Sequence, residues 1–256
     1  MSNSSFPLEI SRLEEMASNA HVALNTLFYD GWILKFSEGY TGRANSVSKI
    51  YPSSKPIEEK VAYCEEVYNK QGLPCQFKLI DSDKDFYDFL VKRGYAVVTP
   101  TDIMTLDLQA QKSFQSLNED SKIEYVFSSS EKDWLPIFYR IHEITDLHDQ
   151  DVFKRMLAKV LVKTIYCTLL YEGKPAACAS AAIEDSCMLL QNVVVAPEFR
   201  GLGLGKKLCQ GLLEKAYKDG AHYSYLQVVQ NNGPAIHIYK KLGFEKLYSY
   251  WYMKKN

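Results

Sequence analysis

One stretch of the sequence decides the expected fold, and it reads VVVAPEFRGLGLG from Val193 to Gly205. An apolar strand runs into a glycine-rich turn, and the turn opens a helix that we expect to continue to Lys218. In this geometry, unpaired backbone N–H groups and the positive end of the helix dipole point at one place. Glycine lets the backbone adopt positive φ and approach an anion closely. The stretch therefore predicts a site for a phosphate or pyrophosphate, with a purely structural turn as the alternative.

The spacing of the glycines excludes two common phosphate-binding motifs. Gly201, Gly203 and Gly205 do not match the GxGxxG spacing of dinucleotide-binding turns. No Gly-Lys-Ser or Gly-Lys-Thr end follows, so the turn is not a Walker A loop. The expected phosphate ligand is therefore of another kind.

A second motif follows downstream and reads LQVVQNNGPAIHIYKKLGF from Leu226 to Phe244. It predicts a strand, an asparagine-rich loop and a short helix, with Pro234 near the helix start and Gly243 just past its end. Upstream of both motifs, the pattern predicts a strand, two helices and a hairpin around a Glu-Gly-Lys turn. Residues 122–256 therefore have the expected element order β-α-α-β-β-β-α-β-α-β.

Together, the two motifs resemble those of the GNAT superfamily of acetyltransferases. The pattern Arg200-x-x-Gly203-x-Gly205 is similar to the family's motif A, and Leu226 to Phe244 is similar to its motif B. Both stand in the family order, and the expected elements match the family fold. The resemblance implies an α/β (α+β) fold with a mixed, largely antiparallel sheet flanked by helices.

The resemblance also implies an enzyme: an acyltransferase that moves an acetyl group from acetyl-coenzyme A to a primary amine of a small molecule or peptide. The alternative is a non-catalytic protein that binds or senses acyl-coenzyme A. A relict would be expected to have lost some motif residues. The motif residues present here favour the enzyme, namely Arg200, Gly203, Gly205, Asn231 and Tyr239.

By the same resemblance, three segments would hold acetyl-coenzyme A. Its pyrophosphate would meet the backbone amides of Arg200, Gly201, Leu202, Gly203, Leu204 and Gly205. Its pantetheine arm would pair with free backbone groups of Val193, Val194 and Val195, because in the family a bulge separates this strand from the next. Asn231 or Asn232 would contact the pantetheine or phosphate region, and Ala235 would start the helix beside the cofactor.

Tyr239 is the predicted catalytic residue, because a phenol within reach of the leaving thiolate can protonate it or stabilise its charge. A core tyrosine is the alternative, since the chain has 18 tyrosines. The attacking amine must also lose a proton, and the strand segment Met188 to Asn192 carries no acid. Glu143 is the candidate general base, with a water-relayed base as the alternative.

The N-terminal half repeats the later topology in outline, because a short helix there ends at Gly94 as the later one ends at Gly243. We therefore expect two GNAT-like halves in tandem. A degenerate domain spans 1–108, a linker 109–121, and the catalytic domain 122–256. An independent α+β domain is the alternative for the first half.

The first half lacks the functional elements of the second. It has no glycine between Gly42 and Gly72, so it offers no turn for a pyrophosphate. One polar cluster around Arg43 remains, and this arginine is the candidate for binding a substrate carboxylate or phosphate in a bidentate manner. A surface arginine beside a β-turn is the alternative.

Charge, apolar runs and residue spacing limit the kinds of partner that we expect for this protein. The formal net charge is −1 and no basic stripe is present, so we expect no nucleic acid partner. No signal peptide pattern and no run of about 18 apolar residues occurs, so we expect no membrane partner and a cytoplasmic location. The 6 cysteines and 5 histidines lack metal-binding spacing, so we expect no metal and reduced thiols. The sequence leaves open whether the protein is a monomer or a homodimer.

Overall fold

The computed structural model describes residues 9–110 and 121–255, which form two compact units. The larger unit comprises Ile103–Gln150 and Leu161–Leu247, and the smaller unit comprises Leu8–Asp102, Asp151–Val160 and Tyr248–Asn256. Most of the predicted linker, 111–120, lies outside the described residues.

Three elements contribute residues to both units. They are strand β5 (Tyr95–Asp107), helix α5 (Leu147–Leu157) and strand β11 (Glu245–Lys255). The predicted division into 1–108, 109–121 and 122–256 stays a prediction.

The larger unit is built on a mixed sheet with the strand order β5-β10-β9-β8-β7-β6. Its remaining strands are β6 (Ile123–Ser128), β7 (Lys163–Tyr171), β8 (Lys174–Glu184), β9 (Cys187–Val195) and β10 (Tyr223–Val229). The pairs β6–β7, β7–β8 and β8–β9 are antiparallel, and β9–β10 is parallel. The predicted mixed, largely antiparallel sheet is confirmed.

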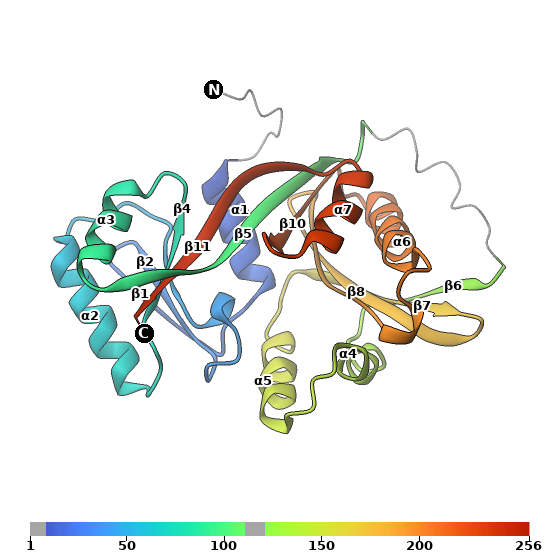
Figure 1. The fold of residues 1–256 in the computed structure, drawn as a ribbon, viewed down its shortest axis with the longest axis horizontal. Coiled ribbons are helices and arrows are strands. Elements are labelled where there is room, and N and C mark those ends of the chain that lie inside the picture. The colour runs from blue at the N-terminus through green and yellow to red at the C-terminus, as the bar shows by residue number, and fades with distance from the viewer. Residues whose placement is uncertain (1–8, 111–120, 256) are drawn as a thin grey trace. The chain divides into compact units, whose positions relative to one another are not determined.

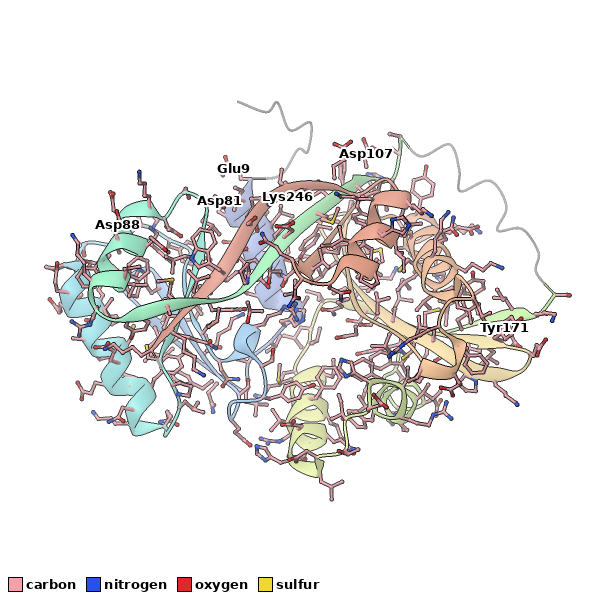
Figure 2. The ribbon with its side chains drawn as sticks, viewed as in Figure 1. Glu9, Asp81, Asp88, Asp107, Tyr171 and Lys246 are labelled. Atoms are coloured by element: carbon pink, nitrogen blue, oxygen red, sulfur yellow. The ribbon has the colours of Figure 1, made fainter. Side chains whose placement is uncertain are left out.

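The predicted hairpin joins β7 to β8. Tyr171 ends β7 (Figure 2), and the turn consists of Glu172 with φ 50° and Gly173 with φ 77°. Positive φ at both central residues gives a turn whose twist matches that of the two strands. Lys174 then begins β8.

Helices cover both faces of this sheet. The helix α6 (Leu204–Lys218) and the helix α4 (Trp134–His142) both pack on β7, β8 and β9, from opposite sides (Figure 1). The sequence places Leu204, Leu208, Leu212 and Ala216 along one face of α6, and the structure buries all four. A shorter helix, α7 (Gly233–Lys241), lies between β10 and β11 in the chain.

The smaller unit repeats this order of elements. It contains α1 (Ile10–Ala20), β1 (Asn25–Tyr29), β2 (Trp32–Phe36), a 3₁₀ turn (Gly42–Ala44), β3 (Val47–Lys49), α2 (Ile57–Lys70), β4 (Gln76–Ile80) and α3 (Lys84–Lys92). An antiparallel pair β1–β2 precedes a parallel pair β3–β4 that α2 connects, just as α6 connects β9 and β10. The repeat supports the predicted tandem arrangement, which stays a prediction.

The smaller unit offers no counterpart of the glycine turn. Its helix α2 begins after Pro56, and its first turn carries Glu58 and Glu59. Carboxylates at a helix N-terminus occupy the place where an anionic ligand would be attracted. That the first half has no pyrophosphate site stays a prediction.

The sequence pattern predicts two features of the smaller unit that the structure does not have. It predicts a strand from Ala44 to Tyr51, but only β3 forms there, because residues Gly42–Ala44 form the 3₁₀ turn. It also predicts that the strand-rich segment from Tyr95 to Leu108 is interrupted at Pro100, but β5 is continuous, although Thr99 has φ 53°. The strand β1 was not predicted at all.

Candidate functional site

The strands β9 and β10 separate part-way along their length. Their paired residues end at Leu190 and Leu226, although β9 continues to Val195 and β10 to Val229. The exposure of β9 changes at the same point, because Cys187 to Leu190 are buried and Gln191 to Val195 are half-buried. Beyond Leu190, β9 therefore presents a backbone edge on which a ligand could form strand-like hydrogen bonds.

A β-bulge marks the point of separation. The register between β8 and β9 shifts between Cys178 and Ser180, and Asn192 has φ 57°. Asparagine tolerates this left-handed conformation better than most residues. The Asn192 Nδ2 atom donates a hydrogen bond to Ser180 Oγ at 2.9 Å, which holds the bulge to the neighbouring strand. The predicted free edge at Val193, Val194 and Val195 lies directly after this bulge.

The glycine turn offers a row of free amides. Gly201 has φ 81° and Gly203 has φ 75°, and a Cβ on either would contact nothing within 4 Å. The N–H groups from Gly201 to Lys206 donate to no backbone acceptor among the described residues, whereas the Arg200 N–H donates to the Pro197 carbonyl at 3.3 Å. The amide row thus begins one residue later than predicted, and it includes Leu202, Leu204 and Gly205.

Gly205 has a different function from the other two glycines. A Cβ added to it would lie 3.3 Å from Ile238 Cδ1 and 3.3 Å from Val195 Cγ2. Its lack of a side chain lets the first turn of α6 contact both the end of β9 and α7. This contact places the amide row beside the free edge of β9.

The electrostatics of the turn suit an anion. No acidic residue lies in the first turn of α6, while Lys206 and Lys207 do. Arg200 is exposed, and its Nε donates to the Val195 carbonyl at 3.3 Å. A row of free amides at a helix N-terminus with nearby cations fits a diphosphate, so the residues present are suited to coenzyme A.

The two asparagines of the loop, Asn231 and Asn232, differ in whether their side chains are available to a ligand. Asn232 is the N-cap of α7, and its side-chain oxygen accepts a hydrogen bond from the Ala235 N–H at 3.2 Å. That oxygen and that N–H therefore satisfy each other within the protein. Asn231 is exposed just before the cap, which leaves its side chain available to a ligand.

Tyr239 lies on α7 and is buried, with 8% of its surface exposed. Its ring packs edge-on against Phe244 at 6.0 Å between centroids. Burial, together with the nearby Cys209, raises the pKa of Tyr239. Its hydroxyl has no hydrogen-bond partner among residues 9–110 and 121–255, so it can donate to a ligand.

The remaining two predicted site residues, Glu143 and Arg43, lie on elements other than the glycine turn, the asparagine loop and β9. Glu143 is exposed and ends α4 in the left-handed conformation, with φ 59°. Arg43 belongs to the smaller unit, where its Nε donates to the Tyr250 hydroxyl at 3.4 Å. Both therefore stay predictions.

One polar side chain was missed by the sequence reasoning. The Gln191 Oε1 atom is fully enclosed and has no hydrogen-bond partner among the described residues. A buried amide oxygen without a donor is costly, which suggests that a ligand supplies one. Gln191 follows the last paired residue of β9, and its side chain projects on the side of Leu189, opposite α6. The one feature of the sequence that could have pointed to this position is the neighbouring Asn192, an asparagine within an apolar strand.

Comparison with known protein families matches residues 127–244 to the acetyltransferase (GNAT) family. Residues 127–244 form a GNAT acetyltransferase domain. This GNAT domain contains β9, the glycine turn, the asparagine loop and Tyr239. The resemblance predicted from the two motifs is confirmed.

Two relatives are similar to different lengths of this chain. The uncharacterized N-acetyltransferase YobR of Bacillus subtilis is 27% identical over 253 residues, which is 96% of this chain and 99% of the relative. The [Ribosomal protein bS18]-alanine N-acetyltransferase of Escherichia coli is 33% identical over 78 residues, which is 30% of this chain and 53% of the relative. The first is similar over both units and the second over a limited part.

Solved structures are similar in fold over most of this chain. A GCN5-related N-acetyltransferase from Kribbella flavida covers 96% of this chain and 95% of its own, with a TM-score of 0.70 and 14% identity. A tandem GNAT protein from the clavulanic acid biosynthesis pathway covers 94% of this chain and 86% of its own, with a TM-score of 0.69 and 13% identity. At such identities the likeness concerns the fold alone.

Three further features of the described residues concern membrane spans, metal ligands and cysteines. None of the described helices is long and apolar enough to cross a membrane. Residues 9–110 and 121–255 contain no cluster of histidine, cysteine and acidic side chains that could hold a metal ion. Five of the six cysteines are buried and Cys75 is half-buried, and all six are free thiols.

Proposed function

We propose that this chain transfers an acetyl group from acetyl-coenzyme A to a primary amine of a small molecule or peptide. One observation carries the proposal: the free amides from Gly201 to Lys206 lie beside a strand edge that opens after Leu190. A diphosphate and an amide-containing chain are the two ligand parts that such a pair of features would bind. Acetyl-coenzyme A contains both.

The backbone would supply most of the binding. The amides of the turn, from Gly201 to Lys206, would donate to the pyrophosphate, and the α6 dipole would add to the attraction. The backbone of Val193, Val194 and Val195 would pair with the pantetheine arm as a neighbouring strand would. Asn231 would add a side-chain contact.

Acetyl-coenzyme A supplies a thioester with an electrophilic carbonyl carbon and a thiolate as leaving group. Tyr239 would keep its proton at Oη, because burial raises its pKa. A phenol that stays protonated through neutral pH can donate a hydrogen bond to a developing negative charge. The raised pKa makes this hydrogen bond the main contribution of Tyr239.

The amine would be bound and deprotonated by other groups. Gln191 Oε1, enclosed and without a donor of its own, would accept a hydrogen bond from the amine. Glu143 is proposed as the base that takes the proton, and its exposed position gives that proton a path to solvent. A water molecule that passes the proton to Glu143 fits the same arrangement.

The proposal is tested by calorimetric titration with acetyl-coenzyme A, followed by a thiol-release assay over a panel of amines. Burial raises the pKa of Cys64, Cys178, Cys187 and Cys209 to about 12, so the protein's own thiols add little background. Binding with release on an amine supports the enzyme. Binding without release on any amine supports the sensing protein, and no binding refutes both.

A further inference from the structure

A group of basic side chains lies on one face of the sheet in the smaller unit. We call four residues the basic cluster: His21 after α1, Lys35 on β2, Arg43 in the 3₁₀ turn and Lys78 on β4. They come from four separate segments, yet the charges of Lys35, Arg43 and Lys78 all act on His21. The fold therefore gathers them at one place.

The cluster lies on the opposite side of the sheet from the main apolar core of the unit. On β4, Lys78 stands between Phe77 and Leu79, and both of these belong to that core. Successive residues of a strand point to opposite faces. The apolar core with α2 and α3 thus covers one face, and the basic cluster occupies the other.

Lys35 is the least compensated member of the cluster. Its residue is 5% exposed, and its Nζ makes a single hydrogen bond to the His21 carbonyl at 3.4 Å. It has no ion pair with any described carboxylate. Burial and the charge of Lys78 lower the pKa of Lys35 to about 8. A buried ammonium without a counter-charge is unfavourable unless something neutralises it.

His21 gives a second, independent sign of a missing ligand. Its Nδ1 atom is fully enclosed and has no hydrogen-bond partner among the described residues. Burial, followed by the charges of Arg43, Lys35 and Lys78, lowers the pKa of His21 well below its usual range. The imidazole is therefore neutral and carries a single N–H. Whichever ring nitrogen holds that hydrogen, the Nδ1 atom has no partner among the described residues.

The carboxylate whose charge acts on Lys35 already has other partners. Glu14 on α1 pairs with Lys78 through Oε2, and its Oε1 accepts a hydrogen bond from the Tyr248 hydroxyl at 2.6 Å. Lys78 also lies over the Tyr250 ring, 4.0 Å from its centroid. Both oxygens of Glu14 are thus engaged by groups other than Lys35.

We propose that the basic cluster is a binding site for the anionic group, carboxylate or phosphate, of a small-molecule ligand. The Lys35 ammonium would form the central ion pair, the neutral His21 ring would lie beside it, and Arg43 would contribute its guanidinium charge. The site belongs to the smaller unit, and it stands independently of the acetyl transfer proposed for the larger one. It gives the first half of the chain a binding function of its own.

Calorimetric titration of the full chain with inorganic phosphate and with succinate, at constant ionic strength, tests the site and separates the two sources of anion. We expect saturable binding of at least one of them. Lys35→Met preserves the length of the side chain and removes the charge, and it should weaken that binding at least tenfold. The control is Lys70→Met, which removes a charge from an exposed pair with Glu66 and should leave the affinity unchanged.

A second variant separates this site from the pyrophosphate site. In Gly203→Glu the glycine turn carries a carboxylate, and the Lys35-dependent binding should persist. Binding that disappears in Gly203→Glu but not in Lys35→Met would assign the anion to the turn and overturn the proposal. Absence of saturable binding for both anions would overturn it as well.

A measurement on the unaltered protein covers the case in which Lys35→Met does not fold. An amine with a lowered pKa is partly neutral near pH 8, so an acylating reagent that reaches Lys35 Nζ by the route of the anion can modify it. The modification is located by peptide mass spectrometry. We expect phosphate or succinate to slow the labelling of Lys35 at least tenfold and to leave that of Lys70 unchanged. Equal labelling of Lys35 with and without both anions would contradict the proposal.

Discussion

Gly205 and Val195 approach so closely that a Cβ on the glycine would stand 3.3 Å from Val195 Cγ2. The start of α6 therefore packs directly on the Val195 side chain at the end of β9. This contact holds together the amide row and the free strand edge, the two features proposed to bind a ligand. The hydrogen bond from Arg200 Nε to the Val195 carbonyl adds a polar connection between the turn and the strand.

Gly205→Val should separate the two features. The larger side chain must displace Val195 and Ile238, and overpacking of this kind typically costs about 1–3 kcal/mol. We expect a lower free energy of unfolding by urea and a weaker affinity for acetyl-coenzyme A. Gly233→Ala is the control, because a Cβ there has open space. Unchanged affinity in Gly205→Val would show that the contact does not position the site.

Gly203→Glu should prevent binding of acetyl-coenzyme A. A carboxylate would then stand beside the pyrophosphate, and two like charges 4 Å apart repel by about 4 kcal/mol near a protein surface. We expect an affinity reduced by at least about 10²-fold in calorimetry. Gly173→Glu introduces the same residue at a similar φ of 77°, also with open space, in the hairpin turn. Equal losses in the two variants would point to backbone strain and not to the ligand.

Tyr239→Phe should lower kcat by about 10²-fold and leave the affinity for acetyl-coenzyme A nearly unchanged. The hydroxyl has no partner in the protein, so its removal breaks no internal hydrogen bond. Because burial raises the pKa of Tyr239, the phenol stays protonated, and kcat should not fall through its ionisation below about pH 10. Tyr87→Phe, on α3 of the smaller unit, is the control. Full turnover in Tyr239→Phe would remove this residue from the mechanism.

Glu65 should make the smaller unit sensitive to acid. Burial opposes its ionisation, but hydrogen bonds from Arg93, Lys255 and Tyr95 outweigh burial and lower the pKa of Glu65 to about 2. A carboxyl whose pKa is lower in the folded state stabilises the fold above its unfolded value. That stabilisation, at most about 3 kcal/mol, is lost as the pH falls from about 4.5 to 2.

The measurement for Glu65 is urea unfolding at several pH values between 2 and 7. Glu65→Gln should lower the stability at pH 7 and flatten its decline below pH 4.5. Glu66→Gln is the matched control, because this neighbour forms an exposed pair with Lys70. An equal pH dependence in Glu65→Gln and the unaltered protein would contradict the assignment.

Elements with a strong local signal were predictable from the sequence. The sequence pattern predicts a strand from Trp32 to Phe36, a helix from Ile57 to Lys70 and a strand from Gln76 to Ile80. The structure has all three with these limits, because their patterning and their bounding residues are local. The strand β1 was missed. It pairs only with β2, and Phe28 is 67% exposed, so it shows none of the regular alternation of a half-buried strand.

Features of the site that depend on distant contacts were not predictable. The glycine turn could be read from spacing alone, but the enclosure of Gln191 Oε1 depends on where β9 leaves β10. Similarly, Lys35 stands within the apolar segment WILKF, and its burial depends on the packing of the face around it. Capping by Asn232 was within reach of the sequence, because asparagine favours the position before a helix.

The strand β11 begins in the larger unit and completes the smaller one, where Tyr250 to Lys254 pair with β4. During synthesis, the segments of the smaller unit up to Asp102 are made before β11, so β4 has to wait for its neighbour until Tyr250 to Lys254 have been added. Domains ordinarily fold one after another as the chain emerges. In this protein the smaller unit can complete its sheet only after the segments of the larger unit have been translated.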